Sequence, residues 1–314
     1  MDVVEQPVFL VGSERSGSTL LRLMLDHHPD IAFNLESEFL VTRISDDGVF
    51  PEMEDYRTWL EQDRVFRHSR FSIDGSLDYA GLVNDFLMQK KKRDDKQVVG
   101  ATVHYQFGKL RLIWPDAKYI YLYRDGRDVA RSVVQMGWAG NPYVAADWWL
   151  EAEREWEVLR GRIPGDKWVE VRYEELIGNP QTELMKICGF IGTAYSDRMF
   201  DYTKNSSYAM PDPKLNYQWR KKMSRKDLRL IEAKIGSQLT RRGYELSGLP
   251  PISAGGLRNE IIRMHSRLAV LKYKVEKFGL GLVVQEMVSR HLGLSGWNRL
   301  ATDRMNKIID ADLR

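Results

Sequence analysis

The sequence has one cysteine and no long apolar segment, and these two features exclude several classes of protein. The single cysteine, Cys188, cannot form an internal disulfide, so nothing requires an oxidising compartment. The sequence also shows no pattern of zinc ligands. No run of about 18 apolar residues occurs, and no charged segment followed by an apolar one precedes the first strand. We therefore expect a soluble, cytoplasmic protein with no signal peptide, membrane span or metal.

Neither sign of charge dominates. Lys and Arg total 47 against 44 Asp and Glu, a net charge of +3 with a pI near 8.7. This small excess suits an anionic ligand but is too weak for a nucleic-acid-binding surface. The length of 314 residues is enough for one large α/β domain, alone or with a small appendage.

A lysine is missing from the segment that otherwise reads as a nucleotide phosphate loop. The stretch FLVGSERSGSTLLRLMLDHHPD, residues 9–30, has the order strand, glycine-containing loop and helix. In the P-loop pattern G-x-x-x-x-G-K-[ST], Gly12, Gly17 and Thr19 fit, but Ser18 occupies the lysine position. The loop's only cation is Arg15, so we expect a single phosphate-like group here rather than a triphosphate with magnesium.

Three apolar runs predict strands that alternate with helices. They are PVFLVG (7–12), KYIYLYR (118–124) and WVEVRYEEL (168–176). Such alternation predicts an α/β fold, a P-loop-like parallel sheet flanked by helices on both faces. Ligands bind such sheets at the carboxyl ends of the strands, where all three runs end in polar loops.

The sequence divides into two predicted parts. Residues 1–248 are expected to form the α/β domain, with helices and loops of about 40–95 as a lid or substrate wall. After the linker GLPPISAGG, residues 249–314 are expected to form a helical extension. Apolar residues recur every four and three positions over 257–278, which suits either a homodimer contact or docking on the main domain.

Two anion sites follow from residue chemistry. A helix start with free N–H groups, two glycines and hydroxyls at Ser16, Ser18 and Thr19 can surround a phosphate. Arg124 ends a predicted strand and Ser132 lies two turns along the next helix, so a second anion fits between them. Two such sites at neighbouring strand ends suit a nucleotide that is phosphorylated at both ends.

These segments resemble sulfotransferases that use 3′-phosphoadenosine 5′-phosphosulfate (PAPS). GSERSGSTLLRLMLDHHPDI resembles their 5′-phosphosulfate loop, YLYRDGRDVARS their 3′-phosphate signature, and VRYEELIGNPQTELMKICGFIG a third motif with Tyr173 near the nucleotide. The carbohydrate and tyrosylprotein types are the most similar in motif. The cofactor contacts that the resemblance implies are Arg15, Ser16, Gly17, Ser18, Thr19, Arg124, Ser132 and Tyr173, with Ser206, Ser207 and Arg220 from a closing loop at 204–224.

The resemblance leaves the catalytic base open. Glu36 lies 21 residues after Arg15, as the catalytic glutamate does in tyrosylprotein sulfotransferases, and Glu38 is its near alternative. His104, in GATVHYQ, stands where sulfotransferases of phenols and steroids have a catalytic histidine. Many relatives also have a lysine in this segment that contacts the sulfuryl group, whereas this chain has Thr102. Besides Arg15, a second cation that contacts the sulfuryl group is therefore not assigned to any residue.

The sequence thus predicts a PAPS-dependent sulfotransferase that acts without a metal. Arg15 stabilises the transferred group, Glu36 or His104 takes the acceptor proton, and adenosine 3′,5′-bisphosphate is the second product. The acceptor hydroxyl, or in second place an amine, is open among small molecules, sugars, lipids and peptides. The alternatives are an ATP-dependent small-molecule kinase, which needs a loop lysine and an acidic magnesium ligand, and a non-catalytic nucleotide-binding scaffold protein.

Overall fold

The computed structural model describes residues 3–312 and divides into two compact units. The first unit comprises Met1–Val129 and Trp148–Lys222, and the second comprises Ala130–Asp147 and Met223–Arg314. These units cut the chain elsewhere than at the predicted boundary of 248 and 249, which stays a prediction. The predicted cofactor and base residues belong to the first unit, except Ser132.

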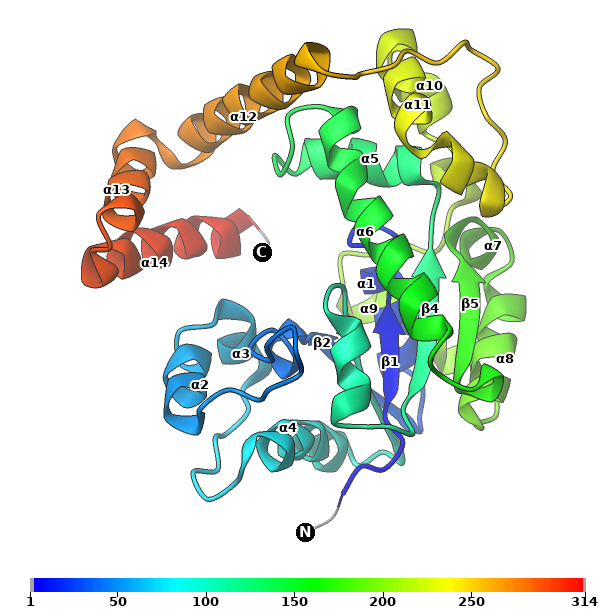
Figure 1. Cartoon of the computed structure of the whole chain (residues 1–314). Coiled ribbons are helices and arrows are strands. Elements are labelled where there is room, and N and C mark those ends of the chain that lie inside the picture. The colour runs from blue at the N-terminus through cyan, green and yellow to red at the C-terminus, as the bar shows by residue number, and fades with distance from the viewer. Residues whose placement is uncertain (1–2, 313–314) are drawn as a thin grey trace. The chain divides into compact units, whose positions relative to one another are not determined.

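The first unit is built on a five-stranded parallel sheet in the order β2-β3-β1-β4-β5. Its strands, three of which Figure 1 shows side by side as β1, β4 and β5, are β1 (Val8–Val11), β2 (Ile31–Glu36), β3 (Val98–Val103), β4 (Lys118–Tyr123) and β5 (Trp168–Arg172). The predicted α/β class is confirmed, as are the three predicted strands, now β1, β4 and β5.

Strands β2 and β3 were not foreseen, and β3 shows why. Gly100 lies inside it, and a residue without a side chain weakens a strand pattern. The glycine is required by packing, since a Cβ there would lie 2.3 Å from the Phe33 ring and 2.4 Å from the Val8 carbonyl oxygen. A long-range steric constraint therefore obscured the local signal.

Helices cover both faces of the sheet. One face packs against α1 (Ser18–Asp26), α7 (Tyr173–Gly178) and α8 (Pro180–Ile191), the last two beside β5 in Figure 1. The other face packs against α2 (Met53–Leu60), α3 (Arg64–Ser69), α4 (Tyr79–Asp94) and the later turns of α6 (Pro142–Arg160). Residues 40–95 thus contain α2, α3 and α4, and most of their apolar side chains belong to the core, while their predicted role as a lid or substrate wall stays a prediction.

The tryptophans of α6 have two different environments. Trp149 and Trp156 are buried, as their heptad spacing predicts, and Trp156 stacks on Tyr121 with ring centroids 4.5 Å apart. Its indole N–H donates to Glu170 Oε1 at 2.6 Å, which satisfies the buried donor. Trp148 instead lines a cavity that is described below.

The second unit contains four longer helices. They are α11 (Arg225–Arg241), α12 (Leu257–Phe278), α13 (Leu280–His291) and α14 (Ser295–Asp312), with the short α5 (Gly126–Gln135) entering from the first unit. Within the unit, α12 docks on residues 137–141: Ser266 Oγ accepts from Gly140 N at 2.8 Å, and Asn141 Nδ2 donates to the Ile262 carbonyl at 3.0 Å.

The heptad residues of α12 do not make this contact. Leu257, Ile261, Met264 and Leu268 are 51–78% exposed, and at 100° per residue they lie on the face opposite to Ser266. The apolar stripe predicted at 257–278 is therefore an exposed seam, defined here by Leu257, Ile261, Met264, Leu268 and Leu271. None of the helices between residues 3 and 312 combines the length and apolarity needed to cross a bilayer.

Candidate functional site

The loop between β1 and α1 has the backbone of an anion cradle. Gly12 and Gly17 adopt φ of +142° and +98°, and a Cβ at these positions would lie 2.2 Å from the Leu122 carbonyl and 2.4 Å from the Tyr173 ring. Arg15 is also left-handed, with φ 68°. No side chain of residues 3–312 caps the start of α1 at Gly17, so its first-turn N–H groups remain available to an anion.

The hydroxyls of this loop fit a phosphate group. Ser16 is 1% exposed, and its Oγ has no hydrogen-bond partner among the described residues. A buried hydroxyl without a partner is costly, which indicates that a ligand completes the site. Ser18 and Thr19 begin α1, where Ser18 is buried and Thr19 half-buried. The predicted contacts Ser16, Ser18 and Thr19 therefore lie at or just before the start of α1, and their role in binding stays a prediction.

His104 joins the end of β3 to this loop. Its Nδ1 lies 3.0 Å from the Gly12 carbonyl oxygen. Because a carbonyl only accepts, Nδ1 must carry a proton, and in neutral His104 the lone pair is on Nε2. Nε2 lies 3.3 Å from Ser18 Oγ and 3.9 Å from Glu36 Oε1. The imidazole therefore stands between the phosphate loop and a carboxylate.

Glu36 reaches this position through an irregularity in the sheet. Asn34 pairs with Ala101, but Glu36 pairs with Thr102, so β2 has one extra residue there. Such bulges re-aim side chains at strand ends. The Glu36 side chain is 51% exposed, which leaves it accessible to an acceptor. Glu36 is the last residue of β2.

Two further carboxyl groups lie near His104. Burial raises the pKa of Glu38 to about 7, with Glu36 adding to the increase, and Glu38 Oε1 accepts from His104 N at 3.1 Å. Burial also raises the pKa of Glu14, against an opposing effect of His104. The sequence named Glu38 only as an alternative base and did not single out Glu14, which follows the strand end like the other loop residues.

Arg124 lies at the end of β4 with long, weak contacts. Its guanidinium carbon lies 4.2 Å from the centroid of the Tyr173 ring, and Nη1 and Nη2 lie 3.4 and 3.3 Å from the carbonyls of Arg15 and Leu215. Its buried Nε has no partner among residues 3–312. A cation held this loosely beside the phosphate loop retains donors for a ligand.

The neighbouring Arg127 pairs with a carboxylate of its own segment. Arg127 donates to both oxygens of Asp125, from Nε at 2.9 Å and Nη2 at 2.7 Å. Asp128 accepts the Gln218 and Trp219 N–H groups at 3.1 and 2.8 Å, and its Oδ2 lies 3.9 Å from Arg124 Nη2. Asp128 therefore fixes the 215–219 segment beside Arg124.

The remaining predicted contacts lie on three elements. Tyr173 starts α7 and is buried under Gly17. Ser206 and Ser207 follow α9 (Tyr202–Asn205), where Ser206 Oγ accepts from Tyr208 N at 3.2 Å, and Arg220 lies in α10 (Trp219–Lys222), directly after the segment fixed by Asp128. Ser132 lies on α5 in the second unit.

Thr102 does not replace the missing lysine. It is 1% exposed, and its hydroxyl is buried without a partner in the part of the chain described. Lys109, the next lysine along the chain, donates to the Ile44 carbonyl at 2.7 Å, Asp46 at 3.2 Å and Gln106 at 3.1 Å. Neither residue offers a second cation at the loop.

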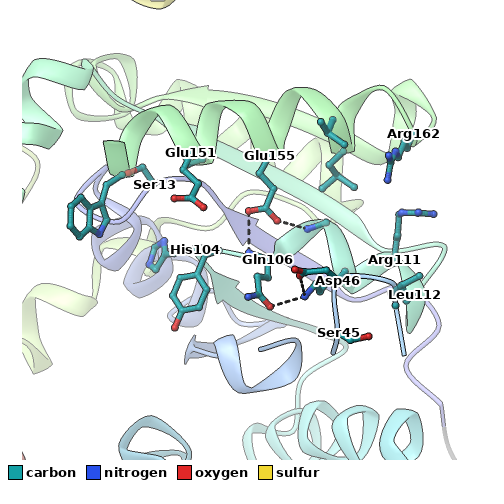
Figure 2. A pocket seen from close by; sticks show the side chains of 18 of the residues that line it. Ser13, Ser45, Asp46, His104, Gln106, Arg111, Leu112, Glu151, Glu155 and Arg162 are labelled. Atoms are coloured by element: carbon teal, nitrogen blue, oxygen red, sulfur yellow. Dashed lines mark hydrogen bonds and ion pairs between the residues drawn. The ribbon is translucent and has the colours of Figure 1, made fainter. Parts of the chain in front are cut away.

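A cavity of about 510 Å³ opens beside the loop at Ser13, Glu14 and His104. Figure 2 shows Glu151 and Glu155 pointing from α6 toward the segment of His104 and Gln106. The sequence did not foresee this cavity, because its walls come from α6, from residues 105–112 and from a short loop at 45–48 that are far apart in the chain. Across residues 3–312, no three His, Cys, Asp or Glu side chains gather as metal ligands.

Known proteins share both sequence and fold with this chain. It is 22% identical over 213 residues to protein-tyrosine sulfotransferase A of Caenorhabditis elegans and 24% over 216 residues to protein-tyrosine sulfotransferase 2 of Gallus gallus. Each alignment covers 62% of this chain and 52% or 53% of the relative, so the chain spans about half the length of these curated relatives.

Two solved structures share the fold. The sulfotransferase domain of the Synechococcus PCC 7002 olefin synthase superposes with a TM-score of 0.59 at 21% identity, covering 77% of this chain and 97% of that domain. The sulfotransferase domain of the curacin biosynthetic pathway gives 0.57 at 17% identity, covering 78% and 100%. Residues 7–197, more than half of the chain, match the family described as "Sulfotransferase family". The chain therefore belongs to the sulfotransferase family.

Proposed function

We propose that this chain transfers the sulfuryl group of PAPS to an acceptor hydroxyl, with an amine as the second choice, and releases adenosine 3′,5′-bisphosphate. The observation that carries the proposal is the cradle at residues 12–19, with its uncapped helix start and the buried, unpartnered Ser16 hydroxyl. Bound PAPS supplies an activated sulfuryl group on its 5′-phosphate.

The loop residues hold the 5′ end of the nucleotide. Backbone N–H groups at the start of α1, with the hydroxyls of Ser16, Ser18 and Thr19, bind the phosphate oxygens. Arg15 lies in the same loop and stabilises negative charge on the leaving phosphate. No magnesium is needed for these contacts, because the donors are N–H groups, hydroxyls and a guanidinium.

A second set of residues holds the 3′ end. Arg124 offers its guanidinium to the 3′-phosphate, and Tyr173, which stacks beneath Arg124, keeps that guanidinium in place. Ser132 is assigned to the same phosphate. Ser206 and Ser207, which follow α9, and Arg220, which lies in α10, are assigned to the nucleotide.

Glu36 is the general base in this proposal, and His104 lies beside it. The Gly12 carbonyl fixes the proton of His104 on Nδ1, so Nε2 faces Ser18 and Glu36. The exposed Glu36 carboxylate accepts the proton of the acceptor hydroxyl as that oxygen attacks sulfur. His104 can share that role, since its Nε2 lies 3.9 Å away from Glu36.

Calorimetry with adenosine 3′,5′-bisphosphate tests the function directly. We expect tight binding that is unchanged by EDTA, and far weaker binding of ATP with or without Mg²⁺. A preference for ATP with Mg²⁺, or no binding of the bisphosphate, would refute the proposal. Radiolabelled PAPS with a panel of hydroxyl acceptors then identifies transfer.

Two further proposals concern the whole protein. A cytoplasmic location is consistent with the free, buried thiol of Cys188 and is tested by cell fractionation of the tagged chain. A homodimer through the exposed seam of α12 is tested as described in the Discussion.

A further inference from the structure

The cavity beside His104 is an elongated groove along one helix. The residues from α6 that line it, Trp148, Glu151, Ala152, Glu155, Val158 and Leu159, recur every three or four positions and therefore share a face. From Trp148 to Leu159 this face is about 16 Å long, at 1.5 Å per residue. The opposite wall is formed by residues 104–112 and by the loop 45–48. A groove of this length suits an extended acceptor.

Four charged residues of the groove already have partners within the fold: Glu155, Lys109, Asp46 and Asp47, the last of which accepts from the Ser45 hydroxyl. Glu155 accepts from Gln106 N at 3.0 Å and from Gly108 N at 2.9 Å, which fixes the segment that follows His104 (Figure 2). Lys109 donates to Ile44, Asp46 and Gln106, which fixes the loop at 45–48. Glu155 and Lys109 shape the walls and have little capacity left for a ligand.

Four other charged side chains line the groove, and the acidic pair lies at a different end from the basic pair. Glu14 and Glu151 line it together with His104, whereas Arg111 and Arg162 lie near each other toward its far end (Figure 2). None of these four side chains has a hydrogen bond or ion pair to another of residues 3–312. The unpaired charges are therefore acidic where the groove meets the phosphate loop and basic at its other end, where Asp46 pairs with Lys109 and Asp47 accepts from the Ser45 hydroxyl.

The acidic end favours a cation over an anion. Burial raises the pKa of Glu14. His104 and Arg15 oppose this increase, whereas the neighbouring Glu38 and Glu36 add to it, so the three carboxyl groups repel one another. Tyr105 and Trp148 line the same end of the groove, and their ring faces also attract cations. A positively charged ligand group would relieve the repulsion, whereas a carboxylate would increase it.

We propose that this groove binds the acceptor, and that the acceptor carries a protonated amine close to the hydroxyl that receives the sulfuryl group. Glu14 and Glu151 hold the ammonium group. The hydroxyl then lies beside His104 and Glu36, and Arg111 and Arg162 keep the amine away from the far end. This inference rests on the proposed sulfuryl transfer and adds the chemical class of its acceptor.

Three phenols of similar size but different charge test the proposal. They are tyramine, 4-ethylphenol and 3-(4-hydroxyphenyl)propionate, titrated by calorimetry into protein saturated with adenosine 3′,5′-bisphosphate. We expect tyramine to bind about tenfold more tightly than 4-ethylphenol, and the propionate more weakly than both. Transfer from radiolabelled PAPS should follow the same order.

Variants assign the preference to the two carboxylates. Glu14→Gln and Glu151→Gln should each reduce the preference for tyramine severalfold, while binding of 4-ethylphenol is unchanged. Glu157→Gln is the matched control: Glu157 is on the same helix but pairs with Arg160 at 2.8 Å outside the groove, so its preference should equal that of the parent protein.

The outcomes separate this inference from the proposed function. Loss of bisphosphate binding would contradict the sulfotransferase proposal itself. If the bisphosphate binds, then equal affinity for the three phenols, tightest binding of the propionate, or no binding of tyramine overturns the amine acceptor. A tyramine preference that survives in both glutamine variants overturns it as well.

Discussion

The imidazole Nε2 of His104 lies 3.9 Å from the Glu36 carboxylate, although 68 residues separate them in the chain. The two residues are brought together because β2 and β3 are parallel neighbours and both end at the phosphate loop. The two candidate bases therefore form one pair, and the question becomes which member takes the proton.

Glu36→Gln should abolish transfer and leave nucleotide binding intact. The amide keeps the size of the side chain but cannot accept the proton, and a general base contributes about 10²- to 10⁴-fold in rate. Transfer from radiolabelled PAPS measures the loss, and calorimetry with adenosine 3′,5′-bisphosphate measures binding.

His104→Ala provides the contrast. It removes the contact to Ser18 as well as the contact to Glu36, so we expect weaker nucleotide binding together with slower transfer. His68→Ala is the control, since His68 ends α3 with its Nδ1 on the Arg64 carbonyl of its own helix. If His104→Ala abolishes transfer while Glu36→Gln retains it, the base assignment is wrong.

Arg124→Gln should weaken binding only of nucleotides that carry a 3′-phosphate. Removing a charge-assisted contact costs about 1.5–3 kcal/mol, which corresponds to roughly ten- to hundredfold in affinity. Calorimetry should show this loss with adenosine 3′,5′-bisphosphate and little change with adenosine 5′-phosphate. Equal losses of affinity for both nucleotides would show that Arg124 does not contact the 3′-phosphate. A thermal unfolding curve of the variant checks that the contact of Arg124 with Tyr173 is not needed for folding.

Ser16→Ala should reduce nucleotide affinity without destabilising the free protein. The Ser16 hydroxyl is buried with no partner in the described chain, so its removal costs nothing in the free state and removes a donor for phosphate, worth about 1 kcal/mol. Ser69→Ala is the matched control: Ser69 is also buried, but its hydroxyl donates to the Phe66 carbonyl at 2.6 Å. That variant should lose stability and keep its affinity. A Ser16→Ala protein with unchanged affinity would exclude the hydroxyl from the site.

Glu38 should make stability depend on pH. Its pKa rises from 4.5 to about 7 on folding, chiefly through burial. Between these values the folded state binds more protons than the unfolded state, so the free energy of unfolding falls as pH rises, by about 3 kcal/mol in total. Below pH 4.5 the effect is absent, and above pH 7 it is complete.

Chemical denaturation of Glu38→Gln at pH 4.5 and pH 8 measures this effect. The variant should be more stable than the parent at pH 8 and equal to it at pH 4.5, whereas the exposed Glu61→Gln should show no such difference. A stabilisation that is the same at both pH values would contradict the assignment.

The exposed seam of α12 should support self-association that strengthens with salt. Arg258, Arg267, Lys272 and Lys274 flank the seam, so two copies repel at low ionic strength, and salt screens the repulsion while burial of the apolar residues stabilises the pair. Multi-angle light scattering in low and high salt measures the mass, with Leu268→Lys as the disrupting variant. A monomer at high concentration in both salts would remove the dimer.

The sequence by itself determined the parts whose signals are local. The glycines and hydroxyls of residues 12–19, the apolar runs of β1, β4 and β5 and the short spacing between Arg124 and Ser132 are all readable within short windows. A phosphate loop without its lysine already distinguished this chain from an ATP-dependent kinase, because the chemistry depends on residue type at fixed positions.

Other features depend on packing between segments that are far apart in the chain, and only the tertiary structure shows them. The strand β3 was hidden by Gly100, which is required by Phe33 on another strand. The contact of His104 with Glu36, the raised pKa of Glu38 and the separation of charge along the groove arise from through-space distance and burial, which no local pattern encodes. The same holds for the seam of α12: the heptad was visible in the sequence, but its exposure depends on Ser266 and Ile262 forming the docked face instead.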